Sequence, residues 1–249
     1  MLLAFFFPIL LMAAPIKIGV IDTGFCHFKK SYSVKVHSIF KAAGKIHIPP
    51  CQLSQKHPRL HGQLVLESFL KNLDKKVKVE IYPIVVFNDK GKQELGYWKK
   101  AFNYASGQEI DILLMASSFP YYKRLAGFPK LKILSFVASG TVEGSIKKET
   151  SLFPQELTPH EKVIMIGAYS PAIRKNDAIV DSRRKYADKI DYYFPSFQKG
   201  SPLTGSSLSV SLALAKALSH CVLEKMKLCL SKKVYQIPVL NLKSSLSSY

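Results

Sequence analysis

The sequence predicts one α/β domain with a mainly parallel central sheet flanked by helices. Apolar runs of strand length recur along the chain, and amphipathic segments of helical length separate them, a rhythm typical of parallel sheets. The chain has 249 residues, 47% of them hydrophobic, which is enough for one sizeable core. No internal repeat or low-complexity linker divides it. We therefore expect a single domain over residues 15–249.

Five apolar runs predict the strands of this sheet. Residues 16–21 are continuously apolar, as expected for a strand that is buried on both faces. Residues 77–87 predict a second strand, and residues 88–91 predict the turn that follows it. The remaining strands are expected at residues 110–116, 132–138 and 163–168.

Three segments predict helices because their apolar residues recur at helical spacing. They are residues 61–73, residues 97–106 and the Ala- and Leu-rich run that follows Gly205 and ends near Leu218. In the second segment, Trp98 and the apolar residues after it would share one face. The polar, basic stretch at residues 170–185 is predicted to be a surface loop.

Residues 1–14 form an uncharged apolar block that ends in small residues. The block is too short to span a bilayer, and it predicts the hydrophobic region of a secretory signal peptide. A buried first strand and an uncleaved anchor are the alternatives, because no basic residues precede the block. We expect cleavage after Ala13 or Ala14, export to the periplasm or the extracellular space, and no stable membrane span afterwards.

The four cysteines agree with an oxidising compartment because their number is even. Proximity in the sequence favours the pairs Cys26–Cys51 and Cys221–Cys229, although four cysteines allow three connectivities. Free buried thiols are the alternative. No CxxC pair is present and no other residues have zinc-site spacing, so we expect no structural metal.

The formal net charge of +19 favours contact with acidic partners. Only five of the 36 basic residues are arginines, and specific phosphate or base recognition depends largely on arginine forks. No nucleic-acid-binding module is recognisable. We expect a solvated lysine surface and no specific nucleic-acid partner, with attraction to acidic polymers or cell envelopes as a second hypothesis.

A candidate nucleophile precedes the third predicted helix. Gly205 is followed by Ser206 and Ser207 and then by the helical run. At the mouth of a helix, unpaired backbone N–H groups and the macrodipole favour a developing negative charge, as a nucleophilic serine requires. The alternative is a simple N-cap. Ser207 is the candidate, and Ser206 and Ser209 are its competitors.

Two further polar residues lie at the ends of predicted elements. Asp22 ends the first strand, where open α/β sheets build their sites, and His61 begins the first helix. Taken alone, each has a structural alternative, a turn cap for Asp22 and a surface position for His61. Asp22-Thr23-Gly24 also matches the tripeptide of aspartic proteases. Those enzymes need two such carboxylates, and this chain has one copy.

In the order Asp22, His61, Ser207 the chain resembles the subtilisin-like serine proteases (subtilases), because chymotrypsin-like and α/β-hydrolase chains order their triads differently. The resemblance covers residues 16–218 and rests on three motifs and the strand–helix rhythm between them. It implies a three-layer subtilisin-like fold and a secreted serine-type endopeptidase. Ser207 would form the acyl-enzyme, with His61 as general base and Asp22 as its orienting partner.

The resemblance also implies residues for substrate binding. An extended peptide would pair with the backbone of Ala116, Ser117 and Ser118. Thr141 occupies the place of the family's oxyanion-hole Asn, and a local shift of register would bring in Ser139 instead. The chemistry needs no cofactor; relatives often bind structural calcium, but no acidic loop here identifies a site. We expect a monomer that acts on proteins or peptides.

Besides Thr141, four positions depart from the family pattern. Gln63, Leu66 and Glu67 replace small residues on the predicted first helix, and Ser211 replaces a Pro four residues after the candidate nucleophile. Secreted relatives usually carry a pro-segment, and the predicted leader leaves no room for one before the first strand. These departures favour an alternative function, a catalytically degenerate pseudoprotease that binds peptides or a partner protein.

Overall fold

The computed structural model describes residues 14–26, 33–45, 47, 60–120, 131–140, 151–157, 160–171, 178–180 and 189–233. At its centre is a sheet in which seven strands follow the order β10-β9-β7-β5-β1-β4-β2, with β11 also paired to β9 and β3 to β4. Every neighbouring pair of this sheet runs parallel except β10 and β9. The predicted α/β class with a mainly parallel sheet is confirmed.

The predicted apolar runs form the middle of the sheet, where strands are buried from both sides. β1 lies between two strands. It pairs with β4 on one side, where Ile16 is opposite Val79, and with β5 on the other side, where Ile18 is opposite Ile112. Because these strands are parallel, their carboxyl ends meet at one edge of the sheet. The bounds are β1 (Ile16–Asp22), β4 (Val79–Val85), β5 (Ile112–Met115), β7 (Leu134–Ala138) and β9 (Val163–Pro171).

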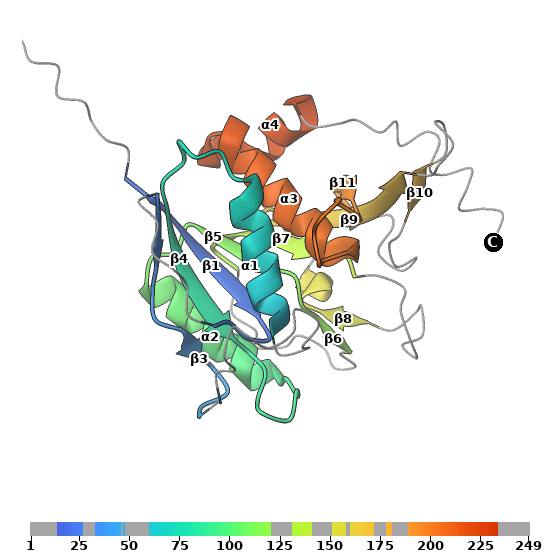
Figure 1. The fold of residues 1–249 in the computed structure, drawn as a ribbon. Coiled ribbons are helices and arrows are strands. Elements are labelled where there is room, and N and C mark those ends of the chain that lie inside the picture. The colour runs from blue at the N-terminus through green and yellow to red at the C-terminus, as the bar shows by residue number, and fades with distance from the viewer. Residues whose placement is uncertain are drawn as a thin grey trace, which may run out of the picture.

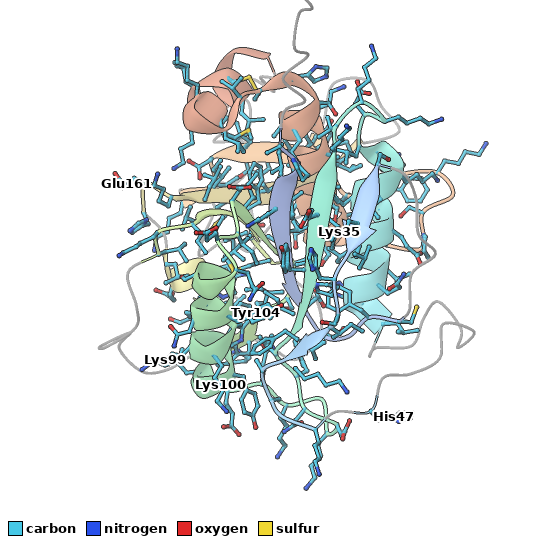
Figure 2. All side chains as sticks on the ribbon, turned by 90° about the vertical axis from the view of Figure 1, so that its left-hand side faces the viewer. Lys35, His47, Lys99, Lys100, Tyr104 and Glu161 are labelled. Atoms are coloured by element: carbon cyan, nitrogen blue, oxygen red, sulfur yellow. A yellow bond between two sulfur atoms is a disulfide. The ribbon has the colours of Figure 1, made fainter. Side chains whose placement is uncertain are left out.

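Helices cover both faces of the sheet and complete three layers (Figure 1). α1 (His61–Asn72) and α3 (Gly205–His220) pack on each other and on one face. α2 (Leu95–Gly107) packs on the opposite face, as the rotated view shows (Figure 2). Its buried residues are those predicted to share one face of the helix, namely Trp98, Ala101, Phe102 and Ala105.

Several short elements were not predicted. They are the edge strands β2 (Val34–Val36), β3 (Phe40–Lys41), β10 (Ala178–Val180) and β11 (Tyr192–Pro195), and the antiparallel pair β6 (Phe119–Pro120) and β8 (Leu152–Phe153), with the 3₁₀ turns η2 (Gln155–Leu157) and η4 (Leu223–Lys225).

One correction concerns the loop predicted at residues 170–185. β9 continues to Pro171, and β10 pairs with it in antiparallel fashion. Backbone pairing at the sheet edge therefore overrides the polar composition from which a loop was predicted. Residues 172–177 and 181–185 lie outside the described residues.

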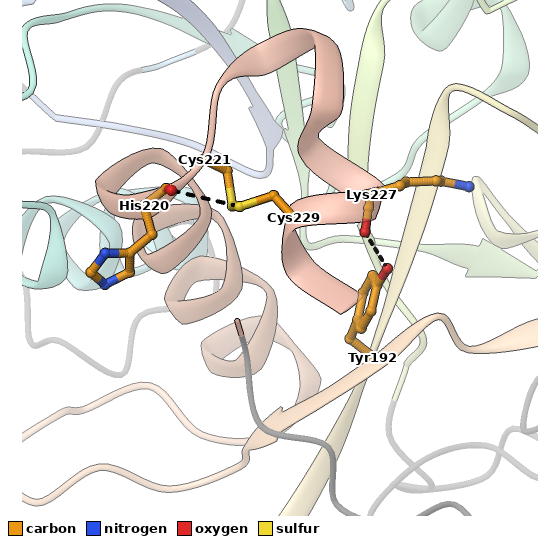
Figure 3. Close-up of a disulfide and its surroundings, with 5 residues drawn as sticks. All are labelled: Tyr192, His220, Cys221, Lys227 and Cys229. Atoms are coloured by element: carbon orange, nitrogen blue, oxygen red, sulfur yellow. Dashed lines mark hydrogen bonds between the residues drawn. A yellow bond between two sulfur atoms is a disulfide. The ribbon is translucent and has the colours of Figure 1, made fainter. Parts of the chain in front are cut away.

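The C-terminal helix α4 (Met226–Lys233) is tied to the end of α3 by a disulfide between Cys221 and Cys229 (Figure 3). The Tyr192 hydroxyl donates a hydrogen bond of 2.8 Å to the Lys227 carbonyl, which holds α4 against β11. The predicted pair Cys221–Cys229 is therefore confirmed. Cys26 is also disulfide-bonded, and Cys51, predicted as its partner, lies outside the described residues.

Among the residues that the structure describes, no helix is long and apolar enough to cross a membrane. Lys35 on β2 is exposed, and Lys99 and Lys100 extend from α2, as Figure 2 shows.

Candidate active site

Asp22 is the last residue of β1 and is fully buried. Its Oδ1 accepts hydrogen bonds from the backbone N–H of Thr23 at 2.6 Å and from Nδ1 of His61 at 2.8 Å. Its Oδ2 is buried and has no hydrogen-bond partner among the described residues. The carboxylate is thus fixed in place and directed at the imidazole.

His61 is the first residue of α1, and the next residue allows the close approach of this helix to β1. A Cβ atom on Gly62 would lie 2.8 Å from the Asp22 Cβ and 2.9 Å from the Gly24 carbonyl oxygen, closer than real Cβ contacts come. The backbone N–H of Gly62 donates to Thr23 Oγ1 at 3.3 Å. A glycine at this position therefore permits the short distance between His61 and Asp22.

Ser207 lies in the first turn of α3, which begins at Gly205. Gly205 has a φ of 68°, a left-handed conformation that favours glycine, and its N–H donates to the Ser196 carbonyl at 2.8 Å. The backbone N–H groups of a first turn have no partner within the helix. The hydroxyl of Ser207 lies 3.0 Å from Nε2 of His61. The structure thus brings together the three predicted residues, from β1, α1 and α3.

The two competing serines lie elsewhere. Ser206 and Ser209 are both buried. The Ser209 hydroxyl lies within hydrogen-bond distance of the carbonyls of Phe194, Pro195 and Gly205, at 2.9 to 3.1 Å. Ser209 therefore fastens α3 to β11, and of these three serines it is Ser207 that hydrogen-bonds to His61.

The Ser207 hydroxyl has two acceptors within reach. Besides His61, it can donate to the backbone carbonyl of Ala116 at 3.2 Å. When His61 is protonated, Nδ1–H donates to Asp22, Nε2–H donates to Ser207, and Ser207 donates to Ala116, so each donor has one acceptor. When His61 is neutral, Nε2 becomes the acceptor for the hydroxyl proton, as activation of a serine requires.

The charge state of His61 follows from two opposing effects. Burial lowers its pKa, but the negative charge of Asp22 and the hydrogen bond to it outweigh burial and raise the pKa above the usual 6.5. The side chain nevertheless keeps 31% of its surface exposed, so it is open to solvent. The site therefore holds a histidine that binds its proton more tightly than an unperturbed imidazole does, because Asp22 lies beside it.

The residues predicted to bind a peptide follow β5, at the edge of the sheet where Asp22 ends β1. Ala116 and Ser117 are buried, and the Ser117 hydroxyl has no partner within the described part of the chain. The carbonyl of Ser118 accepts a hydrogen bond of 2.9 Å from the side-chain amide of Gln93. Sequence reasoning missed Gln93, because nothing in the sequence places it beside Ser118.

The predicted oxyanion position, Thr141, lies outside the described residues. Ser139, which a shift of register would bring in, is fully buried at the end of β7, and its hydroxyl donates to the Gly140 carbonyl at 3.3 Å. In the described ranges no three His, Cys, Asp or Glu side chains are grouped as a metal site would need.

The departures from the family pattern make contacts of their own. Gln63 is buried; its Oε1 accepts the backbone N–H of Cys26 at 3.2 Å, and its Nε2 donates to Glu67 at 2.7 Å. Leu66 is buried in the core. The Ser211 hydroxyl donates to the carbonyl of residue 207 at 2.8 Å. The contact of Gln63 with the segment that follows Asp22 also escaped sequence reasoning.

Comparison with known proteins shows the fold. No family model and no curated protein matches the sequence. Among solved structures, a chain from the subtilase cytotoxin SubAB has a TM-score of 0.64 at 14% identity, covering 92% of this chain and 84% of that one. A lanthipeptide protease has a TM-score of 0.55 at 12% identity, covering 84% and 74%. This protein is thus similar to both in its three-layer α/β architecture.

Proposed function

We propose that this protein is an exported, subtilisin-like serine endopeptidase that hydrolyses peptide bonds through an acyl-enzyme on Ser207. One observation carries the proposal: a continuous hydrogen-bonded chain runs from Asp22 through His61 to Ser207, with distances of 2.8 and 3.0 Å. A nucleophile, its base and a group that orients the base need this geometry. The fold similarity to a lanthipeptide protease and to subtilase cytotoxin also supports it.

In the proposed mechanism, the Ser207 oxygen attacks the carbonyl carbon of the substrate while Nε2 of His61 takes its proton. Asp22 stabilises the imidazolium that forms. The backbone N–H of Ser207, in the first turn of α3, would donate to the developing oxyanion, with Thr141 as the proposed second donor. When the C–N bond breaks, His61 returns the proton to the leaving amine, and a water molecule then hydrolyses the acyl-enzyme by the same steps.

Residues 15–249 would form the peptidase domain behind a cleaved leader, and a disulfide such as Cys221–Cys229 is compatible with export. The substrate would be a protein or peptide that pairs with residues 116–118. The enzyme would be a monomer, and its reaction would need no cofactor. Binding of a structural calcium ion is implied only by the resemblance to the subtilases. The lysine-rich surface would draw the enzyme to acidic polymers or envelopes.

A second candidate is a pseudoprotease that binds peptides without cutting them. Two features favour it: the Thr at the predicted oxyanion position and the hydrogen bond by which the Ser207 hydroxyl can donate to Ala116 instead of to His61. A Thr hydroxyl can still donate a hydrogen bond. Loss of one oxyanion donor costs about 10²–10³-fold in turnover, so slow catalysis would survive even without it.

Covalent labelling tests the proposal. The oxidised full chain is treated with a fluorophosphonate probe, and the adduct is located by peptide mapping. We expect one adduct on Ser207, absent from Ser207→Ala and His61→Ala and retained in the matched control Ser209→Ala. The absence of an adduct on a protein with a native circular-dichroism spectrum would favour the pseudoprotease, and an adduct on Ser206 or Ser209 would refute the assigned nucleophile.

A further inference from the structure

Gln93 lies just ahead of α2 and joins two distant parts of the chain through its side-chain amide. The indole N–H of Trp98 donates to Gln93 Oε1 at 3.0 Å, and Gln93 Nε2 donates to the Ser118 carbonyl at 2.9 Å. Trp98 is fully buried, so it holds the amide in one orientation. The amide can accept the first bond and donate the second, whereas a carboxylate in its place could only accept.

The same segment contacts the nucleophile. Ala116, two residues before Ser118, accepts the hydrogen bond of Ser207 at 3.2 Å. Ser207 belongs to α3, whereas Gln93 leads into α2, and these helices cover opposite faces of the sheet (Figure 1). Residues 116–118 are therefore held from the nucleophile's side by one hydrogen bond and from the opposite layer by the other.

The next residue is fixed as well. Phe119 begins β6, which pairs with β8 through Phe153. The Phe119 ring stacks near Trp98, with centroids 6.4 Å apart, and the Phe153 ring meets Trp98 edge-on at 5.1 Å. Trp98 therefore lies against both the amide of Gln93 and the strand that follows Ser118.

A backbone segment that pairs with an extended peptide gains affinity when its carbonyl and N–H groups are already in position, because no ordering cost remains to be met on binding. We propose that Gln93, held by Trp98, is a positioning residue that fixes residues 116–118 for pairing with an extended peptide. It acts on the recognition of peptide backbone and not on proton transfer at Ser207. This inference rests on the proposed function.

Two diphenyl phosphonate probes test it, because both react with an activated serine but differ in length. The short probe is N-acetyl-alanyl phosphonate, and the long probe is its tetra-alanyl analogue. Alanine side chains require no particular pocket. The second-order labelling rate of the long probe divided by that of the short probe therefore reports backbone pairing. Gln93→Met removes both hydrogen bonds of the side chain. We expect this ratio to fall about tenfold, as the loss of roughly one hydrogen bond between residues 116–118 and the long probe predicts, while the short probe reacts as before.

Two further variants complete the design. Gln93→Glu keeps the acceptor for Trp98 but loses the donor to Ser118, so its ratio falls as well. Gln108→Met changes an exposed glutamine at the other end of α2 and leaves the ratio unchanged. Thermal midpoints confirm that each variant is folded. If the ratio is unchanged in both Gln93 variants, whether the two probes react as before or lose rate equally, the inference is overturned. Labelling of Ser207 by the fluorophosphonate would still uphold the proposed function in that case. If the wild-type protein takes no fluorophosphonate, both the inference and the proposed function fail.

Discussion

The substitution Gly62→Ala tests whether the short contact between α1 and β1 sets the geometry of the candidate base. Gly62 directly follows His61, and an added methyl group would lie 2.8 Å from the Asp22 Cβ, 2.9 Å from the Gly24 carbonyl oxygen and 2.9 Å from the Phe25 ring. Phe25 can rotate away only in part, because it is buried. The other two atoms are fixed by the backbone, so the helix start has to move.

The size of this movement follows from the distances. Ordinary contact begins near 3.4 Å, so α1 must retreat from β1 by roughly 0.6 Å. The His61–Asp22 distance of 2.8 Å then approaches ~3.4 Å, beyond the usual limit for an N–H···O hydrogen bond. We expect the labelling rate of Ser207 to fall about 10²-fold, and overpacking to lower the free energy of unfolding by about 1–3 kcal/mol.

A matched control exists in the same chain. Gly96 is the second residue of α2, as Gly62 is of α1, but a methyl group there meets nothing within 4 Å. Both alanines gain about 1 kcal/mol or less of helix propensity, so the difference between the variants isolates the crowding. Fluorophosphonate labelling rates and thermal midpoints are measured for both. If Gly62→Ala labels at the wild-type rate, the contact does not set the position of His61.

Four other predictions follow from the hydrogen bonds, the raised pKa of His61 and the disulfide. Labelling needs neutral His61, so its rate falls as the pH drops through the raised pKa of His61, and Asp22→Asn moves that inflection to lower pH; a fixed inflection would contradict the assignment. The same raised pKa means that the ion pair of His61 and Asp22 stabilises the fold fully below pH ~6.5, and that this stabilisation is lost as the pH rises through the pKa of His61 in the folded protein. Urea unfolding at several pH values measures this loss. Replacing Cys221 and Cys229 by Ser opens a loop with a sequence separation of 8, and should lower the free energy of unfolding by about 2–3 kcal/mol. The labelling rate of Ser207 should not change, because about 20 Å of α3 separates the disulfide from this residue. Gln63→Ala leaves a buried N–H without its acceptor, and should cost about 1–3 kcal/mol in urea unfolding; an unchanged midpoint would show that water replaces the amide.

Local pattern was sufficient for the central elements and insufficient for the edges. β1 was predicted because a run buried on both faces has to be continuously apolar, and α2 because its buried face repeats at helical spacing. β2 and β3 are only three and two residues long and half-exposed. Their backbone is fixed by pairing with β4, a partner distant in sequence, and so no local pattern marks them.

The same distinction applies to the candidate site. Asp22, His61 and Ser207 each stand where a predicted element begins or ends, so their order and context could be read directly from the sequence. Gln93 occupies no such motif, because its partner Ser118 is 25 residues away and meets it only after α2 has packed on the sheet. Groups that position a site through tertiary contacts leave no spacing in the sequence to recognise.

The departures on α1 bear on the choice between protease and pseudoprotease. Bulky residues in place of small ones can push a helix away from its neighbours. Gln63 instead directs its amide to the backbone N–H of Cys26, and the contact with β1 depends on the glycine that precedes it. His61 keeps both its hydrogen bonds, to Asp22 and to Ser207. The geometry of His61 therefore does not favour the pseudoprotease, and the choice between the two proposed functions depends on the donors that an oxyanion would find.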